Sequence, residues 1–278
     1  MIVDYPADLY VATHTGNDGD VAFYRDSCAG VKSVLELGCG NARILSQLHE
    51  PSRRLVGLDT NPELLAMASA RLGHQRQPAI ELIQADMQSF QLGEQFERII
   101  IPYSGLYCLL DDIALRNCLA CIWDHLCPGG QLVLDAYAID NVHDQGPMET
   151  TRHERFSPIG TISLGDLHYE VAERTIWNHD QQNLDVWYRY QPVAGKPIYT
   201  RLQHRYVLAR QLRDAARATG FKRMDMWGGF HRPPYDPTGS DLIVFRATKP
   251  ATTGLPVKPG RAPGQANRGP TSKIATVG

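Results

Sequence analysis

The pattern that most constrains the fold is an alternation of short apolar strands with helical segments between residues 33 and 136. Runs rich in Val, Ile and Leu recur at 33–38, 54–59, 79–84, 96–101 and 131–136. The segments between them, 42–48, 62–72 and 112–126, carry apolar side chains at helical spacing. Strands that alternate with helices pair in parallel through right-handed crossovers. We therefore expect an α/β fold in which the loops after the strands gather at one edge of the sheet.

The pattern of apolar and charged residues changes after residue 137. Residues 167–177, 184–191 and 198–207 alternate large aromatic with charged side chains across two turn signals, which predicts an antiparallel three-stranded insertion. Helical spacing returns over 208–218, and two closing strands are expected at 221–227 and 241–248. Residues from 251 onward are rich in Pro, Gly, Thr and Ala, and we expect this tail to be disordered.

Composition narrows the class of protein. The chain has 278 residues, 43% of them hydrophobic and 21% charged, which is the globular range. Its net charge is −2. The tail from residue 251 carries four cations and no acid, which leaves the rest of the chain at −6, so we expect no nucleic-acid partner. The first residues resemble no signal peptide, and the apolar stretch 99–110 is too short to span a bilayer, so a cytoplasmic protein without membrane contact is expected.

The strongest local signal is VLELGCGNAR at residues 34–43. A buried strand leads into Gly38-Cys39-Gly40 and then a predicted helix, an arrangement in which glycines let a ligand approach the main chain. The dinucleotide fingerprint is one interpretation, but Arg43 stands where its third glycine belongs. With Glu36 two residues before the first glycine, the stretch resembles motif I of the class I S-adenosylmethionine-dependent methyltransferases.

This resemblance continues in order through 30–136 and 205–249. Asp59 ends the second strand, where the family's acid binds the ribose hydroxyls, and Asp86 with Met87 follows the third, where the adenine binds. FERIIIPYSGLY, HLCPGGQLVLD and ATGF resemble the family's later motifs. The resemblance assigns cofactor binding to Tyr10, Glu36, Gly38, Gly40, Asn41, Asp59, Thr60, Asp86, Met87 and Pro102.

The resemblance implies a Rossmann-like, mostly parallel seven-stranded sheet. It divides the chain into an N-terminal lid segment (1–30), a methyltransferase domain (31–249, with the insertion at about 150–206) and the basic tail (250–278), whose deletion should leave activity intact. It also implies S-adenosyl-L-methionine as cofactor and methyl transfer to an N or O atom of a small molecule. The insertion's place is similar to that in amino-sugar and glycine N-methyltransferases.

Candidates for the catalytic side are Tyr103, in the loop after the fourth strand, His204 and His231. A general base is optional in methyl transfer, and each histidine is weighed against an ordinary surface or structural role. Tyr10 is either a cofactor ligand or a packing residue. The aromatic side chains of the insertion form either a roof over the acceptor or a packing surface, with a homodimer left open: Trp177, Trp187, Tyr188 and Tyr190.

Other chemistries fit the residues less well. A metal-assisted methyltransferase needs an acid where Pro102 stands, so Asp135, Asp140 and Asn141 lack a partner, and the cysteines at 118, 121 and 127 lie in a predicted amphipathic helix without a second ligand pair. No metal is expected. Aminopropyl transfer on the same fold would need more acids than Asp59 and Asp86. A non-catalytic cofactor-binding regulator is the remaining alternative.

Overall fold

The computed structural model describes residues 5–73, 80–146 and 155–251, and two sheets form within these ranges. The main sheet has the strand order β10-β11-β5-β4-β1-β2-β3. Its strands are β1 (Ser33–Leu37), β2 (Arg54–Asp59), β3 (Ile80–Gln84), β4 (Phe96–Ile101), β5 (Leu126–Tyr137), β10 (Arg223–Trp227) and β11 (Leu242–Thr248). Only β11 runs against its neighbours, which confirms the expected seven-stranded, mostly parallel sheet.

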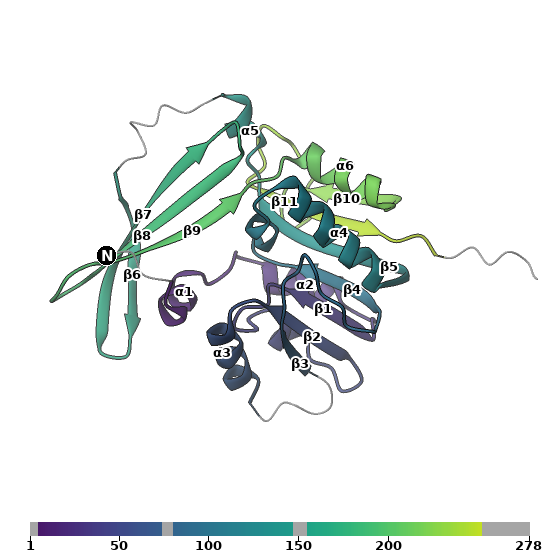
Figure 1. Cartoon of the computed structure of the whole chain (residues 1–278), viewed down its shortest axis with the longest axis horizontal. Helices are drawn as coiled ribbons and strands as arrows, with labels where there is room; N and C mark the ends of the chain where they lie inside the picture. Colours follow the sequence, from purple (N-terminus) through teal and green to yellow (C-terminus); the bar gives the residue numbers. More distant parts are fainter. Residues whose placement is uncertain (1–4, 74–79, 147–154, 252–278) are drawn as a thin grey trace, which may run out of the picture.

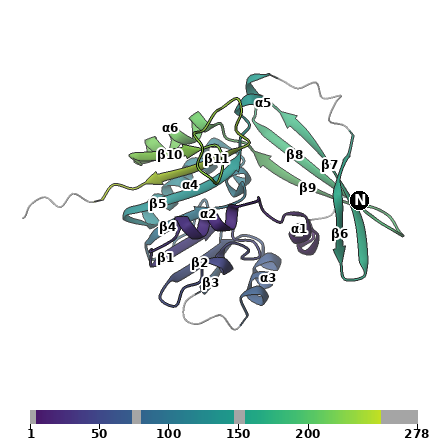
Figure 2. The same cartoon turned by 180° about the vertical axis from the view of Figure 1, so that it is seen from behind.

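Helices cover both faces of this sheet. The helices of the described ranges are α1 (Ala7–Thr13), α2 (Asp20–Ser27), α3 (Pro62–Leu72), α4 (Asp112–His125), α5 (Asp140–Asp144) and α6 (Ala209–Thr219), with short 3-10 segments η1 (Leu45–Leu48) and η3 (Gly105–Cys108). α4 and α6 lie over one face (Figure 1) and α2 over the other (Figure 2). Each face of the sheet has its own apolar core. Leu35 and Leu37 of β1 belong to the core beneath α4 and α6, and Val34 belongs to the core beneath α2, because successive side chains of a strand point to opposite faces.

The predicted helix over 42–48 is wrong. Ala42 has a φ of +58°, in the left-handed region that an α-helix does not contain, and only η1 forms after it. Arg43 turns away from the segment to donate two hydrogen bonds to the Asp20 carboxylate, at 3.0 and 2.6 Å. A long-range ion pair therefore replaces the helical turn that the apolar spacing indicates.

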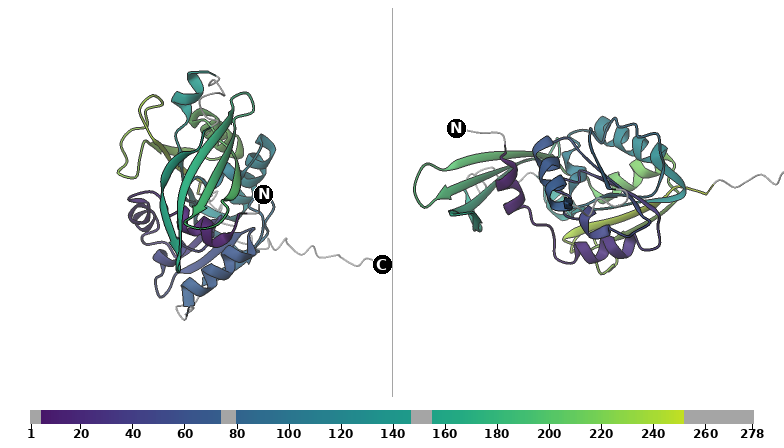
Figure 3. Two further views of the ribbon diagram at one scale, coloured as in Figure 1. Left: turned by 90° about the vertical axis from the view of Figure 1, so that its left-hand side faces the viewer. Right: turned by 90° about the horizontal axis from the view of Figure 1, so that it is seen from below.

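The insertion has four strands rather than three. β6 (Ser157–Leu164), β7 (Leu167–Asn178), β8 (Asn183–Pro192) and β9 (Ile198–Arg205) form an antiparallel sheet in that order. The missed strand, β6, is an exposed edge strand with a register shift between Pro158 and Gly160, residues that sheets tolerate at edges and bulges. Figure 3 shows this sheet face-on and, in its second view, extending away from the main sheet.

Helix α1 connects the two sheets. Its Leu9 packs with Tyr188 and Tyr190 of the insertion in a separate apolar cluster, and Figure 1 shows the helix between the sheets. The expected tail falls almost entirely on 252–278, outside the described residues. None of the helices in the described ranges is both long and apolar enough to cross a membrane.

Candidate active site

The glycine loop is tied to the end of the second strand. Gly38 and Gly40 have φ angles of +68° and +51°, which favour glycine. The Gly40 N–H donates a hydrogen bond to one oxygen of the Asp59 carboxylate at 2.7 Å, and the Asn61 N–H donates to the other at 2.9 Å. Asp59 thus fixes the loop after β1 against the loop after β2, at the carboxyl edge of the sheet.

A cavity of about 370 Å³, called the edge cavity below, opens at this edge. Carboxylates, apolar side chains and bare main chain meet in it, which suits a ligand with hydroxyl groups and a flat ring. Its lining residues are Tyr5, Tyr10, Gly38, Leu58, Asp59, Thr60, Asn61, Leu64, Ala85, Asp86, Met87, Gln88, Pro102, Tyr103, Gly105, Cys108, Leu109, Leu202 and His204. The structure thus brings together most of the site residues predicted from the sequence.

Some predicted residues lie outside this lining. Glu36 is buried below the loop, with 3% of its surface exposed, and burial raises its pKa to about 8. Gly40 and Asn41 shape the turn after the loop rather than line the cavity. His231 lies in the loop between β10 and β11, in a separate hollow beside α2, because Arg232 pairs with Asp26 there. The structure therefore does not bring His231 to the edge cavity.

A second cavity of about 450 Å³, called the roof cavity below, lies under the insertion sheet. Tyr10, Thr13, His14, Tyr103, Ser104, Gly105, Tyr107, Cys108, Tyr137, Ile139, Ile159, Glu173, Thr175, Trp177, Leu184, Val186, Tyr188, Leu202 and His204 line it. Both cavities share Tyr10, Tyr103, Gly105, Cys108, Leu202 and His204. Two compartments that meet at such a junction can hold two reactants against each other.

Tyr103 is held at the junction by a buried aspartate. Tyr103 and Ser104 have φ angles of +54° and +57°, which non-glycine residues seldom adopt. The Asp135 Oδ1 accepts hydrogen bonds from the Tyr103 N–H at 2.9 Å and from the Tyr24 hydroxyl at 2.6 Å. Asp135 has no exposed surface, and burial raises its pKa to about 6. This carboxyl group supports a strained loop and lines neither cavity.

The two histidines that line the roof cavity are poor bases, and one of them, His204, lies at the junction. Burial lowers the pKa of His204 to about 4, and burial together with the charge of His204 lowers the pKa of His14 to about 4. The Tyr5 hydroxyl is 3.1 Å from His14 Nε2, whereas the described side chains give His204 no hydrogen-bond partner. At neutral pH both imidazoles are therefore uncharged, and His204 can accept a hydrogen bond from a ligand.

The N-terminal segment is fastened to both sheets. Tyr5 and Thr13 hydrogen-bond to the Tyr190 hydroxyl in the insertion. At its other end, the Arg43–Asp20 ion pair joins α2 to the glycine loop. Tyr10, between these anchors, lines both cavities, as a residue covering a bound ligand should.

The sequence does not identify His14 or Glu173 as site residues. It also does not predict which aromatic residues of the insertion face the roof cavity. Trp177 and Tyr188 line the roof cavity, Tyr190 is buried against α1, and Trp187 lies on the opposite face under Arg174, 5.2 Å from the ring centre. Strand alternation does separate Trp187 from Tyr188. It does not say which of the two faces meets the main domain.

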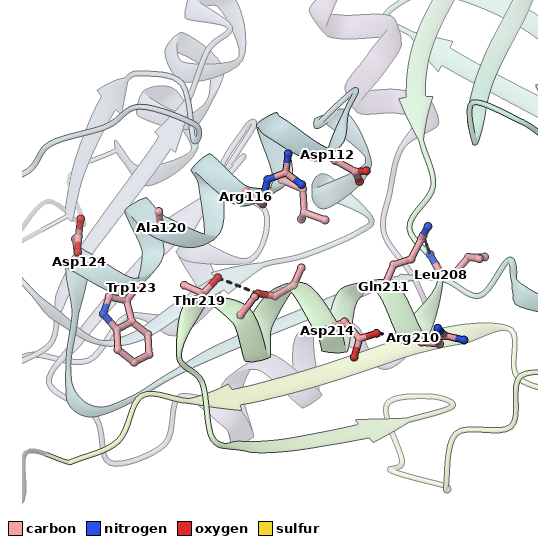
Figure 4. A pocket seen from close by; sticks show the side chains of 13 residues that line it. Asp112, Arg116, Ala120, Trp123, Asp124, Leu208, Arg210, Gln211, Asp214 and Thr219 are labelled. Carbon is pink, nitrogen blue, oxygen red and sulfur yellow. Dashed lines mark hydrogen bonds and ion pairs between the residues drawn. The ribbon is translucent and has the colours of Figure 1, made fainter.

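A larger hollow, of about 800 Å³, lies elsewhere, between α4 and α6 (Figure 4). Trp123 and Asp124 line one end, and Arg210 and Asp214 form an ion pair across one turn of α6. It shares no residue with the edge or roof cavity. It is a surface groove between two helices, away from the glycine loop.

Comparison with known proteins agrees with this geometry. A family model described as a methyltransferase domain matches residues 34–130, from β1 to the Pro-Gly-Gly turn at the start of β5. A Streptomyces fradiae relative, dTDP-3-amino-3,6-dideoxy-alpha-D-glucopyranose N,N-dimethyltransferase, is 25% identical over 64% of this chain and 75% of its own length. Trans-aconitate 2-methyltransferase of Deinococcus radiodurans is 34% identical over 49% of this chain and 50% of its own.

A solved structure shows the same fold over nearly the whole length. It is that of an amino pentose methyltransferase from Micromonospora echinaspora, determined with S-adenosylmethionine bound. Its TM-score is 0.65 at 18% identity, covering 90% of this chain and 99% of that one.

The sheet order, the glycine loop and the two acids at the sheet edge define a Rossmann-like domain that binds an adenosyl cofactor. Residues 34–130 match a methyltransferase domain, and the relatives together with the fold support a class I S-adenosylmethionine-dependent small-molecule methyltransferase. Its residues fit this cofactor, because a side chain at Gly38 would extend into the cavity beside Met87, where its Cβ would lie 3.5 Å from the Met87 Cε.

Proposed function

We propose that this enzyme transfers a methyl group from S-adenosylmethionine to the nitrogen of a small-molecule amine. The observation that carries the proposal is the junction of the two cavities at Tyr10, Tyr103 and His204. The edge cavity would hold the cofactor and the roof cavity the acceptor. When bound, the cofactor supplies an electrophilic methyl carbon on a sulfonium.

On the cofactor side, we assign Asp59 to the ribose hydroxyls and Asp86 to the adenine amino group. Support comes from their places in the edge cavity, after β2 and β3. Both oxygens of Asp59 already accept main-chain hydrogen bonds, so its carboxylate is oriented before a ligand arrives. Gly38 would offer its main chain, and Met87 and Pro102 the apolar walls.

On the acceptor side, the residues chiefly align the nucleophile and exclude water. His204 would accept a hydrogen bond from an acceptor N–H, which directs the nitrogen lone pair toward the edge cavity. An imidazole with a pKa of about 4 does not hold a second ring proton at neutral pH, so His204 cannot keep the proton of an acceptor ammonium group. The acceptor amine must therefore enter as the free base, and the proton released after transfer passes to water.

The acceptors of known relatives favour nitrogen. The printed names of two relatives, from Streptomyces fradiae and Streptomyces venezuelae, describe N,N-dimethyltransferases of dTDP-linked amino sugars. The Deinococcus radiodurans relative is named for trans-aconitate, so a carboxylate acceptor is a second candidate. Glu173 in the roof cavity disfavours it, because like charges repel in a partly desolvated site.

The proposal is tested with the full chain, S-adenosylmethionine and a panel of amines, phenols and carboxylates. Formation of S-adenosylhomocysteine together with an N-methylated product supports it. Methylation of carboxylates alone would move the acceptor atom to oxygen. Cofactor binding without turnover across the panel would favour the regulatory role, and aminopropyl transfer is tested with decarboxylated cofactor in the same assay.

A further inference from the structure

The roof cavity has an unusual balance of charge. Among the described residues that line it, Glu173 is the one acid and none is Lys or Arg. His14 and His204 are uncharged at neutral pH because burial lowers the pKa of each to about 4. An anionic group entering this cavity would lose its water without gaining a counter-charge.

Arg174 and Arg201 of the insertion sheet lie on its other face, and Arg205 pairs with Asp112 of α4. Arg174 follows Glu173 on β7 and therefore points outward, where it lies over the rings of Phe156 and Trp187. Arg201 is paired with Asp185 at 2.7 Å. These two arginines offer no charge to the roof cavity. A third, Arg43, lies 5.8 Å from the ring centre of Tyr103 but is paired with Asp20, so Glu173 is the one acid or base among the described lining residues that carries an unpaired side-chain charge into the cavity.

Glu173 is placed beside the aromatic part of the cavity. It is half-buried and is the direct cross-strand partner of Tyr188, and the interaction of the two side chains contributes, after burial, to the raised pKa of Tyr188. A ligand bound there would meet one carboxylate within a wall of rings, including Trp177. Such a wall packs against apolar or ring-shaped groups and attracts a positive charge.

We propose that Glu173 selects the acceptor, and that the acceptor is a small amine with no carboxylate or phosphate group near its nitrogen. The inference rests on the proposed function. As the acceptor nitrogen bonds to the methyl carbon, the sulfur–carbon bond breaks and positive charge passes from sulfur to nitrogen. The Glu173 carboxylate stabilises that charge, and the surplus proton on nitrogen then leaves to water.

The test uses two matched pairs of probes, tyramine with tyrosine and glucosamine with glucosamine 6-phosphate. Each pair shares an amine and a ring, and one member adds an anionic group. Binding is measured by calorimetry on the full chain saturated with S-adenosylhomocysteine, and transfer by mass spectrometry with S-adenosylmethionine. We expect at least one of the amines without the anion to bind and to be methylated, and its anionic partner to do so about 10- to 100-fold less well.

Variants of one strand separate recognition from general damage. Glu173→Gln should weaken the favoured amine about 10- to 100-fold and leave cofactor binding unchanged. Glu170→Gln removes the same charge from the exposed, outward face of β7 and should have no effect. Glu173→Lys should reverse the preference within the pair.

The outcomes distinguish this inference from the proposed function. Three results would overturn the role of Glu173. They are equal binding of the two members in both pairs, an equal effect of Glu173→Gln and Glu170→Gln, and no binding by any of the amines. Selective binding that depends on Glu173, without methyl transfer, would support it and refute N-methylation. Equal methylation of both members of a pair would support N-methylation and refute the selection by Glu173.

Discussion

Replacing Asp135 by Asn should remove a pH dependence from the stability of this protein. Burial raises the pKa of Asp135 to about 6, above its ordinary value of 3.8. The folded state therefore binds this proton more tightly than the unfolded state, and the stability it provides is present at low pH and lost as pH rises through 6. A pKa of 6 in place of 3.8 corresponds to about 3 kcal/mol, of which about 2 kcal/mol is lost between pH 4.5 and 8.

The assay is urea unfolding of the wild type and the Asp135→Asn variant at pH 4.5 and pH 8. The amide oxygen of the variant can still accept from the Tyr103 N–H and the Tyr24 hydroxyl, so the loop and the activity should survive. Asp135→Ala removes that acceptor, and we expect it to lower kcat by releasing Tyr103 from its left-handed conformation. An identical change in stability between the two pH values for wild type and Asp135→Asn would refute the reasoning.

Three further predictions concern the junction and the cofactor. Asp59→Ala should weaken S-adenosylmethionine binding by about 1.5 to 3 kcal/mol in calorimetry, with Asp59→Asn less affected, and an unchanged affinity would exclude the assigned role. Gly38→Ala should weaken binding more than Gly30→Ala, a matched control with a similar φ of +74° and open space around it. Because burial lowers the pKa of His204 to about 4, kcat/KM should follow the ionisation of the acceptor amine between pH 6 and 9. A step near pH 6.5 that His204→Gln abolishes would show instead that the imidazole is the base.

The main sheet could be predicted because its signals are local. β2 and β4 coincide with the predicted runs, since strands buried on both faces are continuous apolar segments. The places of Asp59 and Asp86 at one edge follow from parallel pairing alone. The acceptor side could not be predicted in the same way, because Glu173 and His14 become part of one cavity only through the docking of the insertion and α1.

Two of the three errors have the same cause, a contact between segments that lie far apart in the chain. Arg43 lies in a segment predicted to be helical, but its side chain pairs with Asp20, twenty-three residues away in the chain. β6 escaped detection because Pro158 and Gly160 are poor strand residues that an exposed edge nevertheless accommodates. His231 follows a strand at the end of the sheet, but its loop folds back along α2. For Arg43 and His231 a contact between distant segments overrides the local pattern, whereas β6 pairs with its neighbour in the chain, β7.

Titration of the full chain with S-adenosylmethionine in a calorimeter tests the central claim most directly. The edge cavity predicts saturable one-to-one binding, competed by S-adenosylhomocysteine and weakened by Asp59→Ala. The same titration is run on protein whose circular dichroism shows the intact fold. An absence of binding by such protein would contradict the assignment of the edge cavity, and with it the account of methyl transfer given above.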